Sequence, residues 1–310
     1  MTFEPLPRTV NHLLVPPIKC QGIKTKLVPF ILENIHWDGR GRWIEPFLGS
    51  GVVLLNVQPP RALINDSNPH IITLYRRIYS GDLTPQMVGE HLTREGAALA
   101  ANGEAHYYAV RQRFTEVADP LDFLFLNRSC FNGVMRFNKK GAFNVPFCRK
   151  TDRFRRAYIT KIVNQVKAIR DVMLGKDWEF RIGDWRDCLG DVDAGDFVYL
   201  DPPYIGRHTD YYSQWSESDA VDLARAAQAL PCGVALSMWR KNRYRLNTHI
   251  DDHWKGMVER TFCHFYHVGP TEDLRNAMEE ALLIKPGYEA PAPPYRRDAE
   301  TAQLLLPFGG

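Results

Sequence analysis

The residues best suited to carry out chemistry are Asp201-Pro202-Pro203-Tyr204. They follow the apolar run 197–200, which predicts a buried strand, so they lie at a strand's carboxyl end, where α/β sheets place their ligands. Two consecutive prolines fix φ and remove two N–H donors. The result is a rigid corner that is rich in hydrogen-bond acceptors and carries a carboxylate and an aromatic ring. The alternative is a turn that only ends the strand.

Such a corner suits an amine whose lone pair is delocalised into a ring, as in N6 of adenine. The Asp201 carboxylate and the Pro202 carbonyl can each accept one N–H, which favours a pyramidal nitrogen with its lone pair aimed at an electrophile. Acceptors that are preorganised around developing positive charge are a strong electrostatic device. The ring of Tyr204 offers a face on which an extruded base can stack. This chemistry requires no metal.

A second candidate site is Gly49-Ser50-Gly51, which follows a predicted strand at 43–47. Glycine lets the backbone adopt positive φ and come close to a ligand. Asp66 lies 15 residues beyond Gly51, after a second predicted strand at 61–65, and an acid at this place can hold ribose hydroxyls. Taken alone, the glycines fit either a nucleotide-like ligand or an ordinary tight turn.

Basic residues are concentrated in one part of the chain. The net charge of all 310 residues is only +3, but residues 128–156 contain nine Lys or Arg and one acid, a local net charge of +8. Aromatic and Asn side chains interleave these charges, which favours a surface that contacts phosphates over a merely solvated basic face. The six cysteines form no Cys-x-x-Cys pair, so we expect reduced thiols and no zinc site.

The elements that must position these residues predict a doubly wound α/β fold. We expect strands at 43–47, 61–65, 179–182, 197–200, 233–237, 258–265 and 280–284, and helices at 52–57, 68–79, 85–101, 104–117, 157–174 and 218–230. Residues 121–126 form a buried apolar run, and residues 131–147 predict a hairpin around Lys139-Lys140-Gly141. We therefore predict a catalytic domain at 1–80 plus 157–286, an inserted recognition domain at 81–156, and a proline-bearing linker and tail at 287–310.

The sequence contains no run of about 18 apolar residues, so we expect no membrane span. The first ten residues lack the apolar core of a signal peptide. We expect a cytoplasmic protein.

From about residue 19 to 286, the chain resembles the Dam-type, alpha-group family of DNA adenine-N6 methyltransferases. The resemblance rests on the cofactor motif at 45–51, the ribose-binding acid at Asp66, two recognition segments at 127–133 and 141–147, and the catalytic tetrapeptide at 201–204. It implies a Rossmann-like methyltransferase sheet with an inserted small helical, hairpin-bearing domain that reads DNA. The cofactor would be S-adenosylmethionine, and the reaction would methylate N6 of an adenine flipped out of double-stranded DNA.

The resemblance also implies site residues. The catalytic set is Asp201, Pro202, Pro203 and Tyr204; the cofactor-binding set is Lys19, Lys24, Phe47, Gly49, Ser50, Gly51, Asp66, Asp184 and Asp201; and the DNA-binding set is Arg128, Asn132, Val134, Arg136, Asn138, Lys139 and Pro146. Base contacts of the family fall on Val134, Arg136 and Pro146, and GATC is the best guess for a short palindromic target. Arg is the usual reader of guanine, but a phosphate contact for Arg136 stays open. For Asp184, a place in the pocket and a capping or surface position both stay open.

The chain departs from the family at its first motif. The family has Lys-Trp-x-Gly-Gly-Lys, whereas Lys19-Cys20-Gln21-Gly22-Ile23-Lys24 stands here. Either the affinity for the cofactor is lower, or another aromatic side chain compensates for the tryptophan that Cys20 replaces.

Two other functions compete with this interpretation. One is a methyltransferase that acts on RNA or on a protein amide nitrogen, although that class usually has Asn in place of Asp201. The other is a non-catalytic DNA-binding module, against which Asp201 and the glycine loop argue. We expect a prokaryotic or phage protein associated with the nucleoid, acting alone or beside a restriction nuclease.

The tail Gln303-Leu304-Leu305-Leu306-Pro307-Phe308 resembles the peptide by which bacterial polymerases bind the replication sliding clamp. Packing of the tail on this protein's own surface is the alternative.

Overall fold

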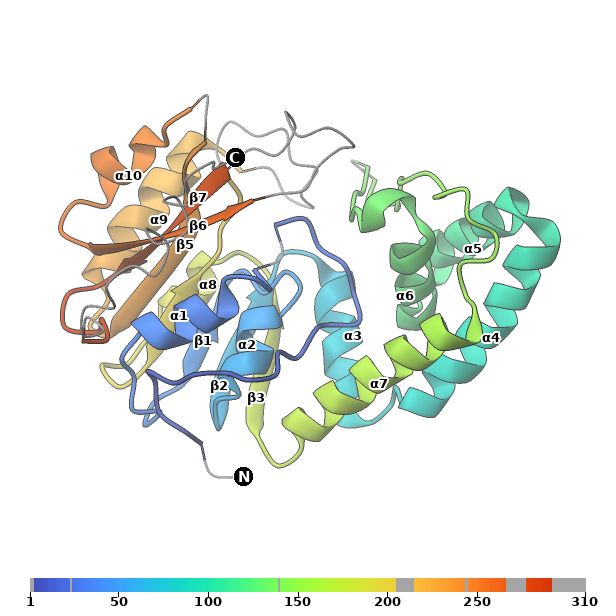
Figure 1. Ribbon diagram of the computed structural model, residues 1–310, viewed down its shortest axis with the longest axis horizontal. Coiled ribbons are helices and arrows are strands. Elements are labelled where there is room, and N and C mark those ends of the chain that lie inside the picture. The colour runs from blue at the N-terminus through green and yellow to red at the C-terminus, as the bar shows by residue number, and fades with distance from the viewer. Residues whose placement is uncertain are drawn as a thin grey trace, which may run out of the picture.

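A twisted sheet forms the centre of the protein (Figure 1). The structure is a computed structural model that describes residues 3–22, 24–138, 140–204, 215–242, 245–265 and 277–291. Within this part of the chain, seven strands form one sheet in the order β3–β2–β1–β4–β5–β7–β6. The strands are β1 (Trp43–Glu45), β2 (Arg61–Asp66), β3 (Asp177–Ile182), β4 (Phe197–Leu200), β5 (Gly233–Asn242), β6 (Val258–Phe265) and β7 (Ala277–Ile284).

The direction of the strands confirms the predicted α/β class. Strands β1 to β5 run parallel, while β7 lies antiparallel to both β5 and β6. Every predicted strand is present, and β4 and β6 have the predicted bounds. The strand predicted at 43–47 ends at Glu45 because Pro46 has no N–H for the ladder.

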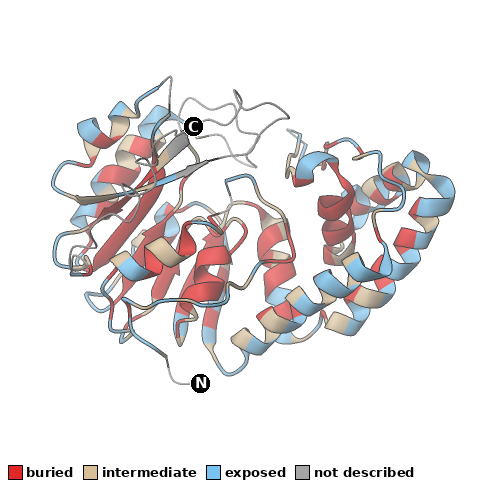
Figure 2. Cartoon of the chain, in the orientation of Figure 1, coloured by how far each residue is buried: buried red, intermediate tan, exposed pale blue. Residues whose placement is uncertain are grey.

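Helices cover both faces of the sheet. On one face lie α1 (Val28–Asn34), α2 (Val52–Val57) and α3 (Pro69–Ser80); on the other lie α8 (Arg186–Leu189), α9 (Glu217–Ala229) and α10 (Thr248–His253). Side chains of a strand alternate between the two faces. In β4, Phe197 and Tyr199 join the first core, whereas Val198 and Leu200 join the second. Figure 2 shows the central strands buried throughout. Helices α1, α8 and α10 were not predicted, because each is too short to show a clear hydrophobic period.

Beyond the β3 edge of the sheet stands a group of helices, α4 (Pro85–Asn102), α5 (Glu104–Val117), α6 (Pro120–Ser129) and α7 (Arg156–Met173) (Figure 1). The apolar run predicted as buried at 121–126 is the centre of α6, where residues 122–129 are all buried. One hydrophobic core runs without a break from the sheet through α3 into α6 and α7. The division into two domains at residues 81 and 156 stays a prediction.

The hairpin predicted at 131–147 is present as an irregular loop. It begins with a 3-10 turn, η1 (Phe131–Gly133), and two isolated antiparallel bridges join Cys130 to Phe147 and Phe137 to Phe143. At the turn, the Asn138 side chain accepts hydrogen bonds from the backbone N–H groups of Lys140 (2.9 Å) and Ala142 (3.0 Å). No described helix is long and apolar enough to cross a membrane.

Candidate active site

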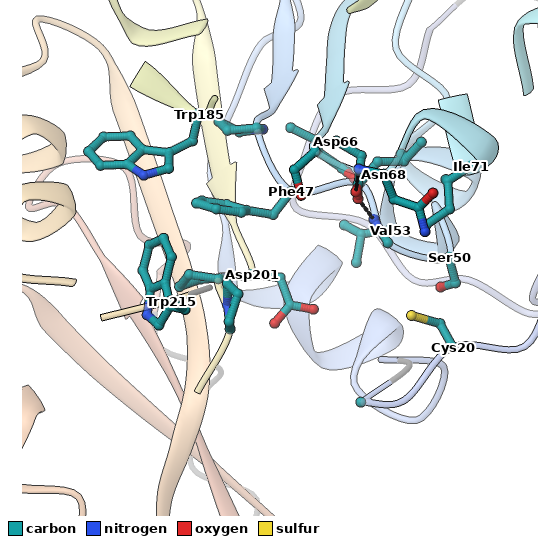
Figure 3. Close-up of a pocket in the computed structure, with 18 of the residues that line it drawn as sticks. Cys20, Phe47, Ser50, Val53, Asp66, Asn68, Ile71, Trp185, Asp201 and Trp215 are labelled. Carbon is teal, nitrogen blue, oxygen red and sulfur yellow. Dashed lines mark hydrogen bonds between the residues drawn. The ribbon is translucent and has the colours of Figure 1, made fainter. Parts of the chain in front are cut away.

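A cavity of about 410 Å³ opens at the carboxyl ends of β1, β2, β3 and β4. Figure 3 shows Trp185 and Trp215 towards one end, Asp66, Asn68 and Ser50 towards the other, and Phe47 between them. The other walls come from residues 20–22 and 24, the loop after β1, and the segments that follow β2, β3 and β4. The predicted glycine loop and the predicted proline corner therefore face one space.

The glycine loop is closed by Asp66. The backbone N–H of Gly49 donates to Asp66 Oδ2 (2.8 Å), and the N–H of Asn68 donates to Oδ1 (2.8 Å). Gly49 and Gly51 have φ values of 52° and 73°, in the left-handed region that favours glycine. Gly51 caps α2 but is not among the residues that line the cavity, whereas Gly49 and Ser50 line it. Burial raises the pKa of Asp66, while the two N–H groups act in the opposite direction.

Aromatic rings form the other end of the cavity. The rings of Phe47 and Trp215 meet edge to face, with centroids 5.5 Å apart, and Trp185 is buried beside them. Asp184 and Asp219 also line this end. Arg186 holds both acids, because its guanidinium lies 3.3 Å from Asp184 Oδ1 and 3.0 Å from Asp219 Oδ1. Asp184 therefore takes part in the pocket and also in a surface ion pair.

Asp201 stands where β4 ends, and its carboxylate points into the cavity (Figure 3). Lys24 Nζ lies 3.1 Å from Oδ1, and the Ser237 hydroxyl donates to the same oxygen over 3.4 Å. Among the described residues, no side chain bonds Oδ2. Burial raises the pKa of Asp201, and the Lys24 ammonium counteracts this. One oxygen of the carboxylate is thus anchored by the protein, and the other is left for a ligand.

Behind this corner lies a network of buried polar groups. The ammonium of Lys24 donates to the Tyr204 hydroxyl, and that hydroxyl donates to Glu280 Oε2 (3.1 Å). Burial by itself lowers the pKa of Lys24, but the negative charges of Asp201 and Glu280 raise it well above its usual value. Lys24 therefore keeps its charge although it is only 4 % exposed.

A second acid is buried in the cavity wall. Glu45 ends β1, and its Oε1 accepts a hydrogen bond from Trp43 Nε1 (2.8 Å). Burial raises the pKa of Glu45 to about 8. At neutral pH this carboxyl is mostly protonated, so it can donate a hydrogen bond.

The N-terminal segment joins the cavity to the irregular loop at 131–147. The Asn127 side chain, fully buried at the end of α6, accepts from the Lys19 N–H (2.7 Å) and donates to the Lys19 carbonyl (2.9 Å). A Cβ on Gly133 would lie 2.3 Å from Lys19 Cδ, so this packing requires glycine. Lys19 itself is not among the cavity-lining residues, although Cys20 and Lys24 are. The thiol of Cys20, at the place of the family's tryptophan, has its pKa raised to about 12 by burial.

The predicted DNA-binding residues divide into two groups. Asn132, Asn138 and Pro146 are exposed, and Val134 and Arg136 are half-buried, so these five lie along the surface of the loop. Asn144 orients Arg136, whose Nε and Nη2 donate to the Asn144 side chain (2.9 Å) and backbone carbonyl (3.1 Å). Phe131, which was not predicted, is 55 % exposed beside them.

Arg128 belongs to the other group, since it is only 5 % exposed and donates to the Gln165 side chain (2.6 Å). The prediction that Arg128 contacts DNA does not fit this position, because its guanidinium supports the loop from inside. Exposed basic side chains remain at Lys140, Arg149, Lys150, Arg155 and Arg156. The predicted DNA-binding residue Lys139 lies outside the described residues, as do Ile23, which departs from the family's first motif, and the tail at 303–308.

Sequence reasoning placed Glu45 only as the first residue of the cofactor motif, and it assigned no role to Ser237 or Glu280. A buried charged residue costs free energy unless it is paired, so an acid in an apolar strand is a signal for a site, and Glu45 and Glu280 carry that signal. Ser237 has no such signal, since a serine in a strand is unremarkable until the fold places it beside Asp201.

Comparison with known proteins identifies the family of the chain. Residues 21–253 match the family model described as D12 class N6 adenine-specific DNA methyltransferase. The chain is 31 % identical over 215 residues to the retron Ec67 DNA adenine methylase of Escherichia coli, covering 67 % of this chain and 70 % of that protein. It is 31 % identical to the type II methyltransferase M.MjaIII of Methanocaldococcus jannaschii (68 % and 78 %) and 30 % identical to the DNA adenine methylase of Serratia marcescens (69 % and 77 %). The chain therefore belongs to the D12 class of N6 adenine-specific DNA methyltransferases.

Proposed function

We propose that the cavity binds S-adenosylmethionine beside the proline corner, and that Asp201 presents a flipped adenine to it. The observation that carries this proposal is the position of Asp201, whose carboxylate enters the same cavity that ends at the glycine loop and Asp66. Membership of a DNA adenine methyltransferase family favours this function over RNA or protein methylation and over a non-catalytic module.

The residues present fit this cofactor. Asp66 faces the cavity as a carboxylate at the end of β2, suited to ribose hydroxyls. Phe47 and Trp185 offer apolar ring surfaces to an adenine, with Asp184 at the rim. When bound, S-adenosylmethionine supplies an electrophilic methyl group on a positively charged sulfur.

The chain's own residues prepare the amine. Asp201 Oδ2 and the Pro202 carbonyl accept the two N–H bonds of N6, which draws the nitrogen out of conjugation with the adenine ring. The anchored carboxylate also counters the positive charge that builds on nitrogen, and preorganised acceptors of this kind act strongly where water is excluded. The Lys24 ammonium donates to the Tyr204 hydroxyl and so holds the ring in place for stacking against the base.

We propose that the loop from Phe131 to Pro146 reads DNA. Val134, Arg136 and Pro146 would contact base edges, and the exposed basic residues near it would contact phosphates. Asn144 orients the Arg136 guanidinium in advance, which suits a bidentate contact with guanine. GATC is the proposed target. Sequencing of methylated bases in DNA from a methylase-free host that expresses the protein tests it, and adenine methylation at another sequence would reject GATC.

The catalytic assignment is tested with Asp201→Ala. We expect N6-methyladenine formation, followed by mass spectrometry of digested DNA, to be abolished while thermal melting shows a folded protein. Asp193→Ala, which removes an exposed carboxylate just before the same strand, is the matched control and should stay active. Near-normal activity of Asp201→Ala would overturn the mechanism.

The tail at 303–308 is proposed as a ligand of the replication sliding clamp, from its sequence alone. A pull-down with purified clamp compares the full chain with one that ends at Ala302. We expect only the full chain to be retained, and equal, negligible retention of both rejects the proposal.

A further inference from the structure

Three charged side chains meet behind the proline corner, and two of them are almost completely buried. Lys24 is 4 % exposed and Glu280 is 2 % exposed, while the Asp201 side chain is 26 % exposed towards the cavity. Buried charges are tolerated only when they are paired and hydrogen-bonded. Lys24 needs a counter-charge, and the structure gives it two.

If Asp201 were the only counter-charge, the catalytic corner would be neutral. A carboxylate whose charge is balanced by an ammonium 3.1 Å away attracts a developing cation less strongly. The proposed reaction places positive charge on N6 of adenine beside this carboxylate. A second negative charge near Lys24 is therefore useful for the chemistry.

Glu280 has the position for that charge. Its Oε2 accepts from the Tyr204 hydroxyl (3.1 Å), which in turn accepts from Lys24, so the donors point in one direction along the chain of groups and end on a carboxylate. One ammonium and two carboxylates leave a net charge of −1 at the corner.

An irregularity in the pairing of β5 and β7 lies beside Glu280 and directs its side chain towards Tyr204. Glu280 pairs with Trp239 of β5, and the register shifts between Trp239 and Lys241, opposite Glu280 and Glu279. Irregularities of this kind often re-aim a side chain next to an active site. The neighbouring Glu279 serves a different purpose, because it lies 3.3 Å from Lys241 Nζ, a side chain that is 55 % exposed.

We propose that Glu280 is a positioning residue for methyl transfer, which balances Lys24 through the Tyr204 hydroxyl and so leaves Asp201 a net negative charge to present to the amine. This inference rests on the proposed function of the cavity. Glu280 does not touch the substrate; it acts through Tyr204 and Lys24.

The test replaces Glu280 with glutamine, whose amide oxygen can still accept from Tyr204 but carries no charge. Single-turnover methylation of unmethylated bacterial genomic DNA is measured with saturating radiolabelled S-adenosylmethionine. We expect the rate constant to fall about 10- to 100-fold, while the Kd for the cofactor changes less than about threefold. Glu279→Gln is the matched control on the same strand and should retain the wild-type rate.

The pH profile separates positioning from a merely structural role. The titratable groups that act on Asp201 include Lys24, Tyr199, Tyr204, Glu45, Cys20 and Glu280. The negative charge of Glu280 raises the pKa of Asp201, so Glu280→Gln lowers it. The acid limb of the rate profile then moves to lower pH, although the maximal rate is reduced. Loss of folding stability alone would not move this limb to lower pH, because a less stable protein unfolds in acid at a higher pH.

Two further variants make the result decisive. Glu280→Asp keeps the charge and is expected to restore the position of the acid limb. If Glu280→Gln does not fold, Glu280→Ala, which also removes the charge, takes its place. A rate and pH profile of Glu280→Gln equal to those of Glu279→Gln would overturn the inference. If Glu280→Gln matches Glu279→Gln while Asp201→Ala is inactive in the same assay, only the inference about Glu280 fails. If Asp201→Ala is active, the proposed function fails first.

Discussion

Replacing Asp66 with asparagine tests a carboxylate that has two roles in the structure. It closes the glycine loop by accepting the N–H groups of Gly49 and Asn68, both at 2.8 Å, and it faces the cavity where ribose would lie. Asparagine has the same shape but only one acceptor atom. If its carbonyl oxygen keeps the bond to Asn68, its amide donor is turned towards the N–H of Gly49, and that N–H loses its partner.

The two roles give two separate magnitudes. An unsatisfied buried N–H costs about 1–3 kcal/mol, so the free energy of unfolding falls by that amount without any ligand, and Tm falls by roughly 2–12 °C. A hydrogen bond to a charged group contributes about 1.5–3 kcal/mol. Loss of the bond to ribose therefore raises the Kd for S-adenosylmethionine roughly 10- to 150-fold, since each 1.4 kcal/mol is about tenfold.

Calorimetry with S-adenosylmethionine measures the affinity, and thermal melting without ligand measures the stability. Asp177→Asn is the control, because Asp177 is an exposed acid at the start of the neighbouring strand β3, at the opposite end of the sheet. An unchanged Kd with a lowered Tm would leave only the loop-closing role. An unchanged Kd and an unchanged Tm would refute the reasoning altogether. Binding of DNA, measured by fluorescence anisotropy, should change little in either case.

Three more changes follow from the structure. Arg136→Ala should reduce discrimination at one base pair by about 1–3 kcal/mol, measured as rates on duplexes that differ at single positions; a uniform loss on all sequences would instead assign Arg136 to phosphate. Burial raises the pKa of Glu45 from 4.5 to about 8, so the folded state holds a proton that the unfolded state has released, and stability falls as pH rises through this window. Denaturant unfolding of Glu45→Gln should lack this fall between pH 5 and pH 8, and a parallel fall in both proteins would contradict the raised pKa. Asn127→Ala should lower the free energy of unfolding by about 2–5 kcal/mol, because the N–H and the carbonyl of Lys19 lose their partners; an unchanged denaturation midpoint would show that water replaces the amide.

The sequence alone determined the order of the main elements and the segments that form the candidate site. The bounds of α2 and β4 agree with the predictions because both are short apolar segments with strong punctuation, glycines before one and two prolines after the other. The corner at Asp201 and the loop at Gly49 both follow parallel strands, and parallel strands end at the same edge of a sheet. Their meeting in one cavity could therefore be predicted.

Other features were beyond sequence reasoning because they depend on side-chain direction. Arg128 lies in the most basic segment of the chain, yet α6 turns it inward against Gln165. Helix α6 itself is buried on nearly all sides, so its residues carry no periodic pattern that distinguishes an inner face. The loop after it has bridges in place of regular strands, since glycine and proline interrupt the ladder.

Only the tertiary structure decided which groups surround the Asp201 carboxylate. Lys24, Ser237 and Glu280 come from the N-terminal segment, β5 and β7, and each reaches Asp201 or Tyr204 across a long stretch of chain. Nothing in local sequence encodes such a meeting, because it follows from strand order and from the face to which each side chain points. Burial strengthens these interactions. Charged groups that are nearly buried and lie a few ångströms apart change one another's pKa, whereas the same lysine and glutamate in water would have little influence on Asp201.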